Sequence, residues 1–135
     1  MQVDGILETA IYCEDLDAAE RFYGRVVGLE RIARDPRRHV FFRCGRGVLL
    51  IFNPTATSGP SARVGGGIVP SHGAHGPGHL AFRIAAGALD ACRAHLEERG
   101  VSIESEVAWP GGGRSIYVRD PAGNSVEFAT ADVWE

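Results

Sequence analysis

The feature that most constrains the fold is an internal repeat, in which one strand, one helix and three strands follow one another twice along the chain. In the first copy, residues 6–12 alternate like a half-buried strand, a helix pattern starts at Asp15, and strand patterns follow at about 29–34, 38–44 and 47–53. The second copy has strand patterns at about 78–84, 101–108, 114–119 and 124–130, with a helix pattern over 86–99. The repeat predicts two βαβββ modules, over about 6–53 and 78–130, joined by a connector at 54–77.

Length and composition narrow the classes of protein further. A chain of 135 residues fits one domain, and no apolar run approaches the roughly 20 residues that span a bilayer. The formal charge of −3 argues against a nucleic-acid partner. The start of the chain lacks a basic segment followed by an apolar one, and the three cysteines are widely spaced. We therefore expect a cytoplasmic protein without a membrane partner.

Strand alternation gathers candidate metal ligands on one face of each module. In the strands at 6–12, 78–84 and 124–130, alternate apolar residues would pack on a helix, which leaves Glu8, His79 and Glu127 on the other face, here called the open face. Each is followed two residues later by alanine, which leaves room for a bound group. Each of these residues also has an interpretation without a metal. Glu8 can be a solvated carboxylate, His79 can be satisfied by hydrogen bonds within the protein, and Glu127 can pair with Arg83 or Arg114.

The correspondence between the modules extends to single residues. Glu8 corresponds to His79, 71 residues later, and the segment 38–43 corresponds to 114–119, 76 residues later. If the turn after 119 is two residues longer than its counterpart, Leu49 takes the position equivalent to Glu127. An even insertion keeps both side chains on equivalent faces, because side-chain direction in a strand repeats every two residues.

Three motifs occur in a characteristic order: Glu-Asp-Leu-Asp-Ala-Ala-Glu-Arg-Phe-Tyr at 14–23, Gly-His-Leu-Ala-Phe at 78–82, and Ser-Ile-Tyr-Val-Arg-Asp-Pro-Ala-Gly-Asn-Ser-Val-Glu at 115–127. Together they resemble the vicinal oxygen chelate superfamily, which includes glyoxalase I, fosfomycin-resistance proteins, extradiol dioxygenases and bleomycin-resistance proteins. The resemblance covers nearly the whole chain. It implies an α+β fold, with two βαβββ modules forming a cup-shaped mixed sheet with helices on the outside, as a single domain over 1–135.

The resemblance also implies a metal centre. Its ligands would be Glu8, His79 and Glu127, and they would bind one divalent metal ion. A Glu-His-Glu set suits Mn²⁺, Fe²⁺ or Co²⁺, and it also accepts Ni²⁺ or Zn²⁺.

Further residues are expected to contact the substrate. The resemblance implies that Tyr117 is catalytic, donating a hydrogen bond to a substrate oxygen. Ser115 lies two residues earlier on the same side of its strand and is expected to bind a substrate oxygen as well. The apolar Leu49 and Ile51 are expected to shape the substrate-binding cup.

The sequence departs from glyoxalase I at two positions. That enzyme has a proton-transferring carboxylate on the fourth strand of its first module, where this chain has Leu49, or Ile51 if the alignment shifts by two. Neither side chain can move a proton. The arginine that holds glutathione in bacterial glyoxalase I corresponds to Tyr12, although Asn53 matches a glutathione-contacting asparagine. Glyoxalase I activity is therefore not expected.

The expected function is that of a metal-dependent lyase, dioxygenase or transferase that chelates a small-molecule substrate through oxygen atoms. The alternative is a metal-free binding protein of the bleomycin-resistance type. The resemblance further implies a homodimer. The connector is rich in glycine and proline and is expected to form a flexible link or lid. Its His72 and His75, with His79, form an alternative metal site.

Overall fold

The structure is a computed structural model that describes residues 1–134. The chain divides into two compact units, Met1–Gly76 and the part from Pro77 onward. Each unit contains one βαβββ module, so the predicted α+β fold with two such modules is confirmed. That both modules form a single domain stays a prediction. Among residues 1–134, none of the helices has the length and apolar character needed to cross a membrane.

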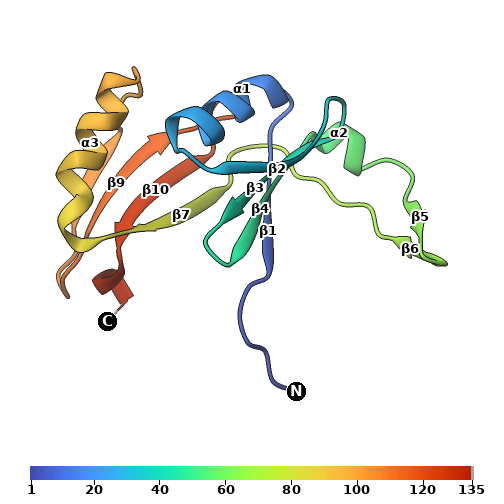
Figure 1. The fold of residues 1–135 in the computed structure, drawn as a ribbon, viewed down its shortest axis with the longest axis horizontal. Coiled ribbons are helices and arrows are strands. Elements are labelled where there is room, and N and C mark those ends of the chain that lie inside the picture. The colour runs from blue at the N-terminus through green and yellow to red at the C-terminus, as the bar shows by residue number, and fades with distance from the viewer. Residues whose placement is uncertain (135) are drawn as a thin grey trace. The chain divides into compact units, whose positions relative to one another are not determined.

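The first unit contains a four-stranded mixed sheet in the order β1-β4-β3-β2 (Figure 1). Its strands are β1 (Glu8–Tyr12), β2 (Glu30–Asp35), β3 (His39–Cys44) and β4 (Gly47–Phe52). Strand β1 runs parallel to β4, and the other neighbours are antiparallel. This is the arrangement expected when a helix connects the first strand of a module to three consecutive antiparallel strands.

One face of this sheet is covered by α1 (Leu16–Glu20), which continues as a π-helical segment, η1 (Arg21–Val26). The Asp15 side chain accepts a hydrogen bond from the Ala18 amide at 2.9 Å and so caps the helix. Apolar side chains of the helix are buried with those of β1, β3 and β4: Leu16, Ala19, Phe22 and Tyr23 with Ile11, Val40, Phe42, Leu49 and Ile51. This packing fixes which face of the sheet remains open.

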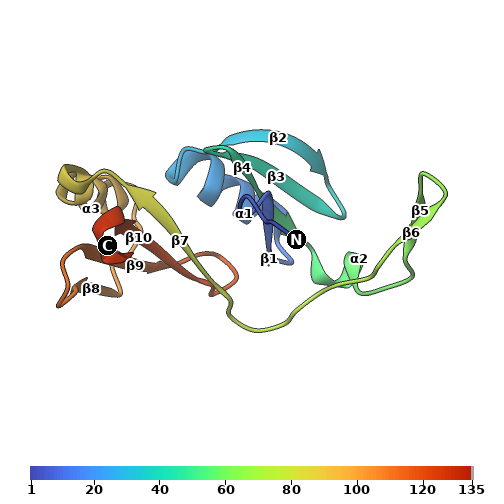
Figure 2. The ribbon, with the colours of Figure 1, turned by 90° about the horizontal axis from the view of Figure 1, so that it is seen from below.

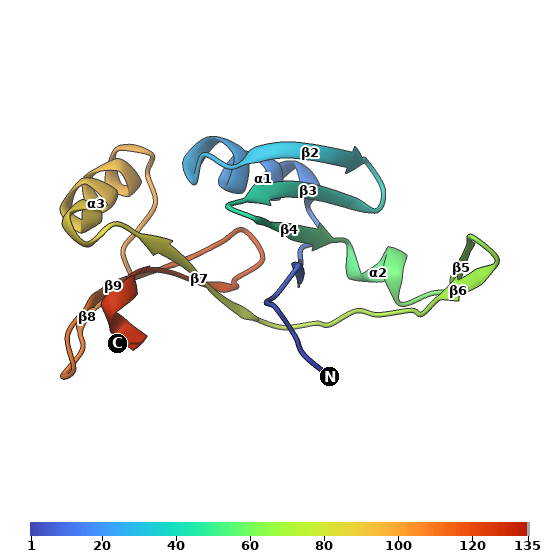
Figure 3. The same cartoon turned by 60° about the horizontal axis from the view of Figure 1, so that its bottom comes forward.

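The second unit repeats the arrangement with the strand order β7-β10-β9-β8. Its strands are β7 (His79–Ile84), β8 (Ser105–Ala108), β9 (Arg114–Arg119) and β10 (Ser125–Thr130). The helical elements are η2 (Ala86–Ala88), α3 (Leu89–Glu98) and η3 (Ala131–Trp134). Helix α3 lies against one face of the sheet, where Leu89 and Leu96 are buried (Figure 3). Strand β8 is shorter than the predicted 101–108.

The turn between β9 and β10 holds the start of β7. The Asp120 carboxylate accepts hydrogen bonds from the amides of Ala122 and Asn124, at 2.9 and 2.8 Å. The Asn124 side chain donates to Asp120 and, through its carbonyl oxygen, accepts from the Gly78 amide at 2.7 Å. Since Asp120 and Asn124 are both buried, these bonds are shielded from water. They fix the backbone immediately before His79.

The connector is more ordered than a flexible link. It forms α2 (Pro54–Thr57) and a hairpin of β5 (Ala62–Val64) and β6 (Gly67–Val69), which extends beyond α2 (Figure 2). Asn53 caps α2 by accepting a hydrogen bond from the Thr55 amide. After the hairpin the connector returns to the module, where the His72 amide donates a hydrogen bond to the Thr57 carbonyl at 3.0 Å. Short-range pattern did not predict this return.

Candidate functional site

His79 begins β7 on the open face of the second unit. Its side chain is 52% exposed. The ring atom Nδ1 lies 3.1 Å from the carbonyl oxygen of Ser125, the neighbouring residue on β10. A carbonyl oxygen can only accept, so Nδ1 carries a proton and donates it. In the neutral ring, the lone pair of the other nitrogen, Nε2, is then directed away from the backbone and is available to a ligand.

Glu127 lies beside His79 and is buried on β10. Its Oε2 atom is 3.4 Å from His79 Nε2. Its Oε1 atom accepts a hydrogen bond from the Ser115 hydroxyl at 2.5 Å, and the Ser115 Oγ atom accepts one from the Trp109 indole at 2.9 Å. This chain of donors fixes the carboxylate and leaves Oε2 directed toward His79.

Tyr117 completes the group on the open face. It is paired with Glu127 across β9 and β10, and its ring stacks on that of His79 with centroids 6.3 Å apart. Burial raises the pKa of the Tyr117 phenol, and its hydrogen bond to Glu127 and the charge of that carboxylate raise it further, while Ser115 acts in the opposite direction. Tyr117 is therefore a neutral hydrogen-bond donor at neutral pH.

The His79–Glu127 pair has the chemistry and spacing of two metal ligands. An Nε2 lone pair and a carboxylate oxygen repel each other unless a proton or a metal cation lies between them. Two ligand atoms about 2.1 Å from one ion are about 3.0 Å apart at an octahedral angle and about 3.4 Å apart at the tetrahedral angle. The observed separation is 3.4 Å. The residues present thus fit a divalent ion, and the Ser125 carbonyl supplies the second-shell acceptor that metal-bound histidines commonly have.

The predicted third ligand belongs to the other unit. Glu8 begins β1 and is exposed on the open face of the first unit. Within neither unit, over residues 1–134, do three or more His, Cys, Asp or Glu side chains form a group that could hold a metal ion. That Glu8 joins His79 and Glu127 stays a prediction.

The alternative interpretation, in which Glu127 pairs with Arg83 or Arg114, is wrong. Arg114 lies 3.8 Å from both Asp90 and Glu106, and not against Glu127. Arg83 forms no ion pair with Glu127 among the described residues, whose contacts with that carboxylate are with Ser115, Tyr117 and His79.

The predicted positions of Leu49 and Ile51 on the open face are wrong by one residue. In the parallel pair β1–β4, Thr9 lies opposite Leu49 and Ala10 opposite Leu50. Leu49 and Ile51 therefore face the helix with Thr9 and Ile11, and Leu49 is only 2% exposed. The open face instead carries Leu50, which is 9% exposed.

The cause of this error is the length of one turn. In the second unit Glu127 pairs with Tyr117, and in the first unit Leu50 pairs with Phe41, 76 residues before Tyr117. Leu50 is therefore the counterpart of Glu127, so the turn of the second module is one residue longer than its counterpart, and not two. The residue at this position is apolar in either register.

Ser115 also has a different role from the predicted one. It is 0% exposed, and its hydroxyl donates to Glu127 while accepting from Trp109. Burial leaves it no surface for a substrate, so it positions Glu127. The contribution of Trp109 was missed, because a tryptophan before a glycine-rich loop has no periodicity that assigns it to a face.

The open face of the first unit carries an aromatic cluster that strand periodicity alone did not single out. The rings of His39 and Phe41 stack at 4.0 Å, and Phe41 meets Phe52 edge to face at 5.2 Å. His72 packs on Phe52 at 4.7 Å and forms a 2.8 Å hydrogen bond with the Tyr12 hydroxyl. His72 therefore has its hydrogen-bond and ring partners within the first unit.

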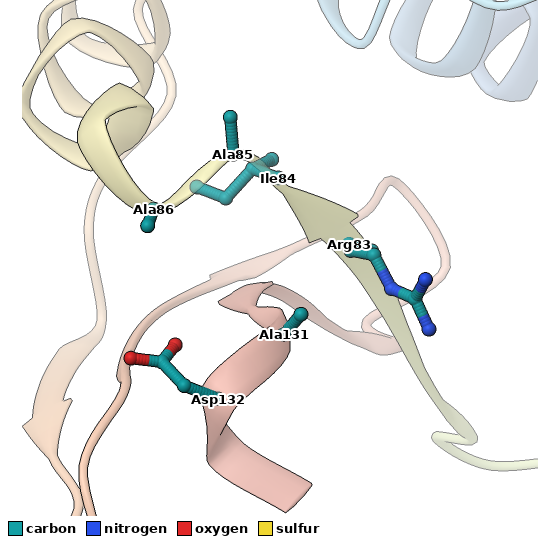
Figure 4. Close-up of a pocket in the computed structure, with 6 residues that line it drawn as sticks. All are labelled: Arg83, Ile84, Ala85, Ala86, Ala131 and Asp132. Carbon is teal, nitrogen blue, oxygen red and sulfur yellow. The ribbon is translucent and has the colours of Figure 1, made fainter. Parts of the chain in front are cut away.

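A separate hollow of about 440 Å³ lies at the end of β7 in the second unit (Figure 4). Its lining consists of Arg83, Ile84, Ala85, Ala86, Ala131 and Asp132. The two charged side chains extend away from each other, and the remaining lining is aliphatic. It contains none of the predicted site residues.

Comparison with known proteins agrees with the fold and the motifs. The family model described as Glyoxalase/Bleomycin resistance protein/Dioxygenase superfamily matches residues 5–128. No curated protein matches the sequence. A solved structure of a protein described as lactoylglutathione lyase from Agrobacterium tumefaciens has 42% sequence identity and a TM-score of 0.92, covering 99% of this chain and 98% of that one.

More distant structures share the fold. A glyoxalase family protein from Bacillus anthracis has 23% identity and a TM-score of 0.70, covering 96% of this chain and 97% of that one. A glyoxalase/dioxygenase from Nostoc punctiforme has 23% identity and a TM-score of 0.68, covering 94% of this chain and 90% of that one.

Proposed function

Since the chain belongs to the Glyoxalase/Bleomycin resistance protein/Dioxygenase superfamily, we propose that it is a metal-dependent enzyme that chelates a small-molecule substrate through oxygen atoms. The proposed metal ligands are Glu8, His79 and Glu127. The observation that carries the proposal is the approach of His79 Nε2 to Glu127 Oε2, at 3.4 Å, with the proton of the imidazole on the other nitrogen. A divalent ion of the Mn²⁺, Fe²⁺, Co²⁺, Ni²⁺ or Zn²⁺ type suits this donor set.

When bound, such an ion supplies Lewis-acid stabilisation of negative charge on a substrate oxygen. The protein's own groups determine how the substrate lies. Tyr117 remains protonated, so its hydroxyl, which donates to Glu127 in the structure, can donate to a substrate oxygen if it turns from that carboxylate. Ser115 and Trp109 keep Glu127 in one orientation through their hydrogen bonds. Ala81 lies opposite Glu127 on the neighbouring strand and leaves space above the sheet.

Metal content tests the proposal directly. Protein purified without an affinity tag and without added metal should contain about one divalent ion per chain by elemental mass spectrometry, because the three proposed donors together would retain such an ion. Protein that stays metal-free after incubation with each of the five ions would contradict the proposal. That result would favour the metal-free binding protein of the bleomycin-resistance type.

A second candidate function is lactoylglutathione lyase activity, which the 42% identity to the Agrobacterium tumefaciens protein favours. The isomerisation needs a base close to the substrate, and the counterpart of Glu127 in the first module is Leu50, which cannot accept a proton. We therefore expect kcat/KM for the methylglyoxal–glutathione hemithioacetal below about 10⁴ M⁻¹s⁻¹ with Ni²⁺, Zn²⁺, Co²⁺ or Mn²⁺. A value above this threshold would identify the isomerase, with Glu8 as the remaining candidate base.

We also propose a cytoplasmic homodimer. Superfamily members often form dimers, and the edge strands of two four-stranded sheets offer surfaces for pairing. Light scattering should give twice the chain mass of 14.5 kDa. A value equal to the chain mass at micromolar concentration would contradict the dimer. The three cysteines are free thiols, which suits a reducing compartment.

A further inference from the structure

A small cavity in the first unit is lined by one arginine, several hydroxyl-bearing residues and a histidine, together with apolar residues. It lies between the start of β3, α2 and the returning connector, and has a volume of about 40 Å³. The polar residues in its lining are Arg38, Thr57, Ser61, Ser71 and His72. No aspartate or glutamate lines it. Because one water needs about 10–15 Å³, the cavity has room for a carboxylate or phosphate group.

Arg38 brings a positive charge to this cavity without a carboxylate partner. Five other arginines form ion pairs with carboxylates: Arg31, Arg34, Arg93, Arg114 and Arg119. Over residues 1–134, Arg38 has no carboxylate within ion-pair distance. The guanidinium is always charged and presents several donors in a plane, a geometry that matches the oxygens of carboxylates and phosphates.

The structure holds Arg38 in place before any ligand binds. Its guanidinium lies over the Phe52 ring, 5.1 Å from the centroid, and Nη1 is 3.1 Å from His39 Nδ1. Its carbonyl oxygen accepts a hydrogen bond from the Asn53 amide at 2.9 Å. A cation that is already ordered loses little side-chain freedom on binding, which favours affinity.

The opposite wall is fixed as well. The His72 amide donates to the Thr57 carbonyl at 3.0 Å, and the His72 ring is bonded to Tyr12 and packed on Phe52. These contacts hold the connector against the module, so that Ser71 and Arg38 line the same cavity. Hydroxyl groups next to a guanidinium add donors to an anion.

We propose that this cavity binds the anionic group of a small ligand, a carboxylate or a phosphate, through Arg38 with Ser61 and Ser71. The site lies within the first unit and uses none of the proposed metal ligands. It therefore goes beyond the proposed function and stands or falls separately from it.

Anion binding to the full-length protein tests the proposal. The protein is first dialysed against EDTA, so that bound metal cannot hold the anion, and is then titrated calorimetrically with inorganic phosphate and with acetate at constant ionic strength. We expect saturable binding of one anion per chain. Arg38→Gln should weaken it by at least about tenfold, since a hydrogen bond to a charged group contributes about 1.5–3 kcal/mol. Tighter binding of phosphate would assign a phosphate-bearing ligand, and tighter binding of acetate a carboxylate-bearing one.

Two further variants keep the test specific. Arg63→Gln removes an exposed arginine of β5 that does not line the cavity, and should leave anion binding unchanged. Ser71→Asp places a carboxylate beside Arg38 without removing the guanidinium from Phe52, and should abolish anion binding in a folded protein. Absence of saturable binding in the wild type would overturn the proposal, as would equal affinities in the wild type, Arg38→Gln and Ser71→Asp.

Discussion

Replacing His79 with alanine should remove the bound divalent ion and lower the Tm of the protein. His79 supplies one of the two donors that the structure brings to 3.4 Å, and its loss leaves only the two carboxylates, Glu8 and Glu127, among the proposed ligands. A ligand present at about 100 times its Kd stabilises the native state by about 2.7 kcal/mol. For a chain of this size that corresponds to a loss of roughly 5–10 °C. Elemental mass spectrometry and thermal denaturation with and without EDTA measure both effects.

The connector provides a matched control. His75→Ala removes an exposed histidine of the alternative set His72, His75 and His79. If Glu8, His79 and Glu127 form the site, His75→Ala keeps both the metal and the response to EDTA. Unchanged metal content in His79→Ala would rule out the proposed ligands. An equal loss of bound metal in both variants would indicate that His72, His75 and His79 form the metal site. Because His79 is half exposed, the alanine variant should retain the far-UV circular dichroism of the wild type.

Local pattern was sufficient to predict the modules. Apolar alternation in strands and helical spacing after Asp15 repeat in the same order, and the structure contains both copies. The same alternation correctly placed His79 and Glu127 on one face, because they lie within strands paired in register. Periodicity is informative here since each strand packs one face on a helix.

Contacts between distant segments were not predictable in this way. The hydrogen bond between Tyr12 and His72 joins residues 60 positions apart, through a connector that has no periodicity. The cavity beside Arg38 depends on the same return of the chain. The burial of Ser115 likewise depends on Trp109, whose side chain reaches it from the loop before β9. A face can be inferred from alternation, but what covers that face comes from elsewhere in the sequence.

Turn length was the remaining source of error. Arg43 pairs with Val48 across four residues, while the equivalent Arg119 pairs with Ser125 across five. The sequence does not show at which residue the pairing of two strands stops and the turn begins. Because successive side chains point to opposite faces, an error of one residue exchanged Leu49 for Leu50.

Glutamate substitutions at these two positions should differ strongly in stability. Leu49 is packed between the sheet and α1, with 2% of its surface exposed. Leu49→Glu would bury a carboxylate without a partner, and we expect a loss of about 3 kcal/mol or more in the free energy of unfolding. Leu50 lies on the open face opposite Ala10 and Phe41. Its replacement can direct a carboxylate away from the helix, so we expect a smaller loss than at position 49.

The comparison tests the register rather than hydrophobicity, because the two variants remove the same side chain and introduce the same charge one residue apart. Urea denaturation followed by circular dichroism measures both, and Leu49→Ala and Leu50→Ala separate the lost packing from the added charge. If the register is correct, glutamate is worse than alanine by a larger margin at 49 than at 50, since Leu49 faces the helix and is 2% exposed while Leu50 lies on the open face and is 9% exposed. The reverse order would place Leu49 on the open face, as the counterpart of Glu127. It would then be the position at which a proton-transferring carboxylate is missing.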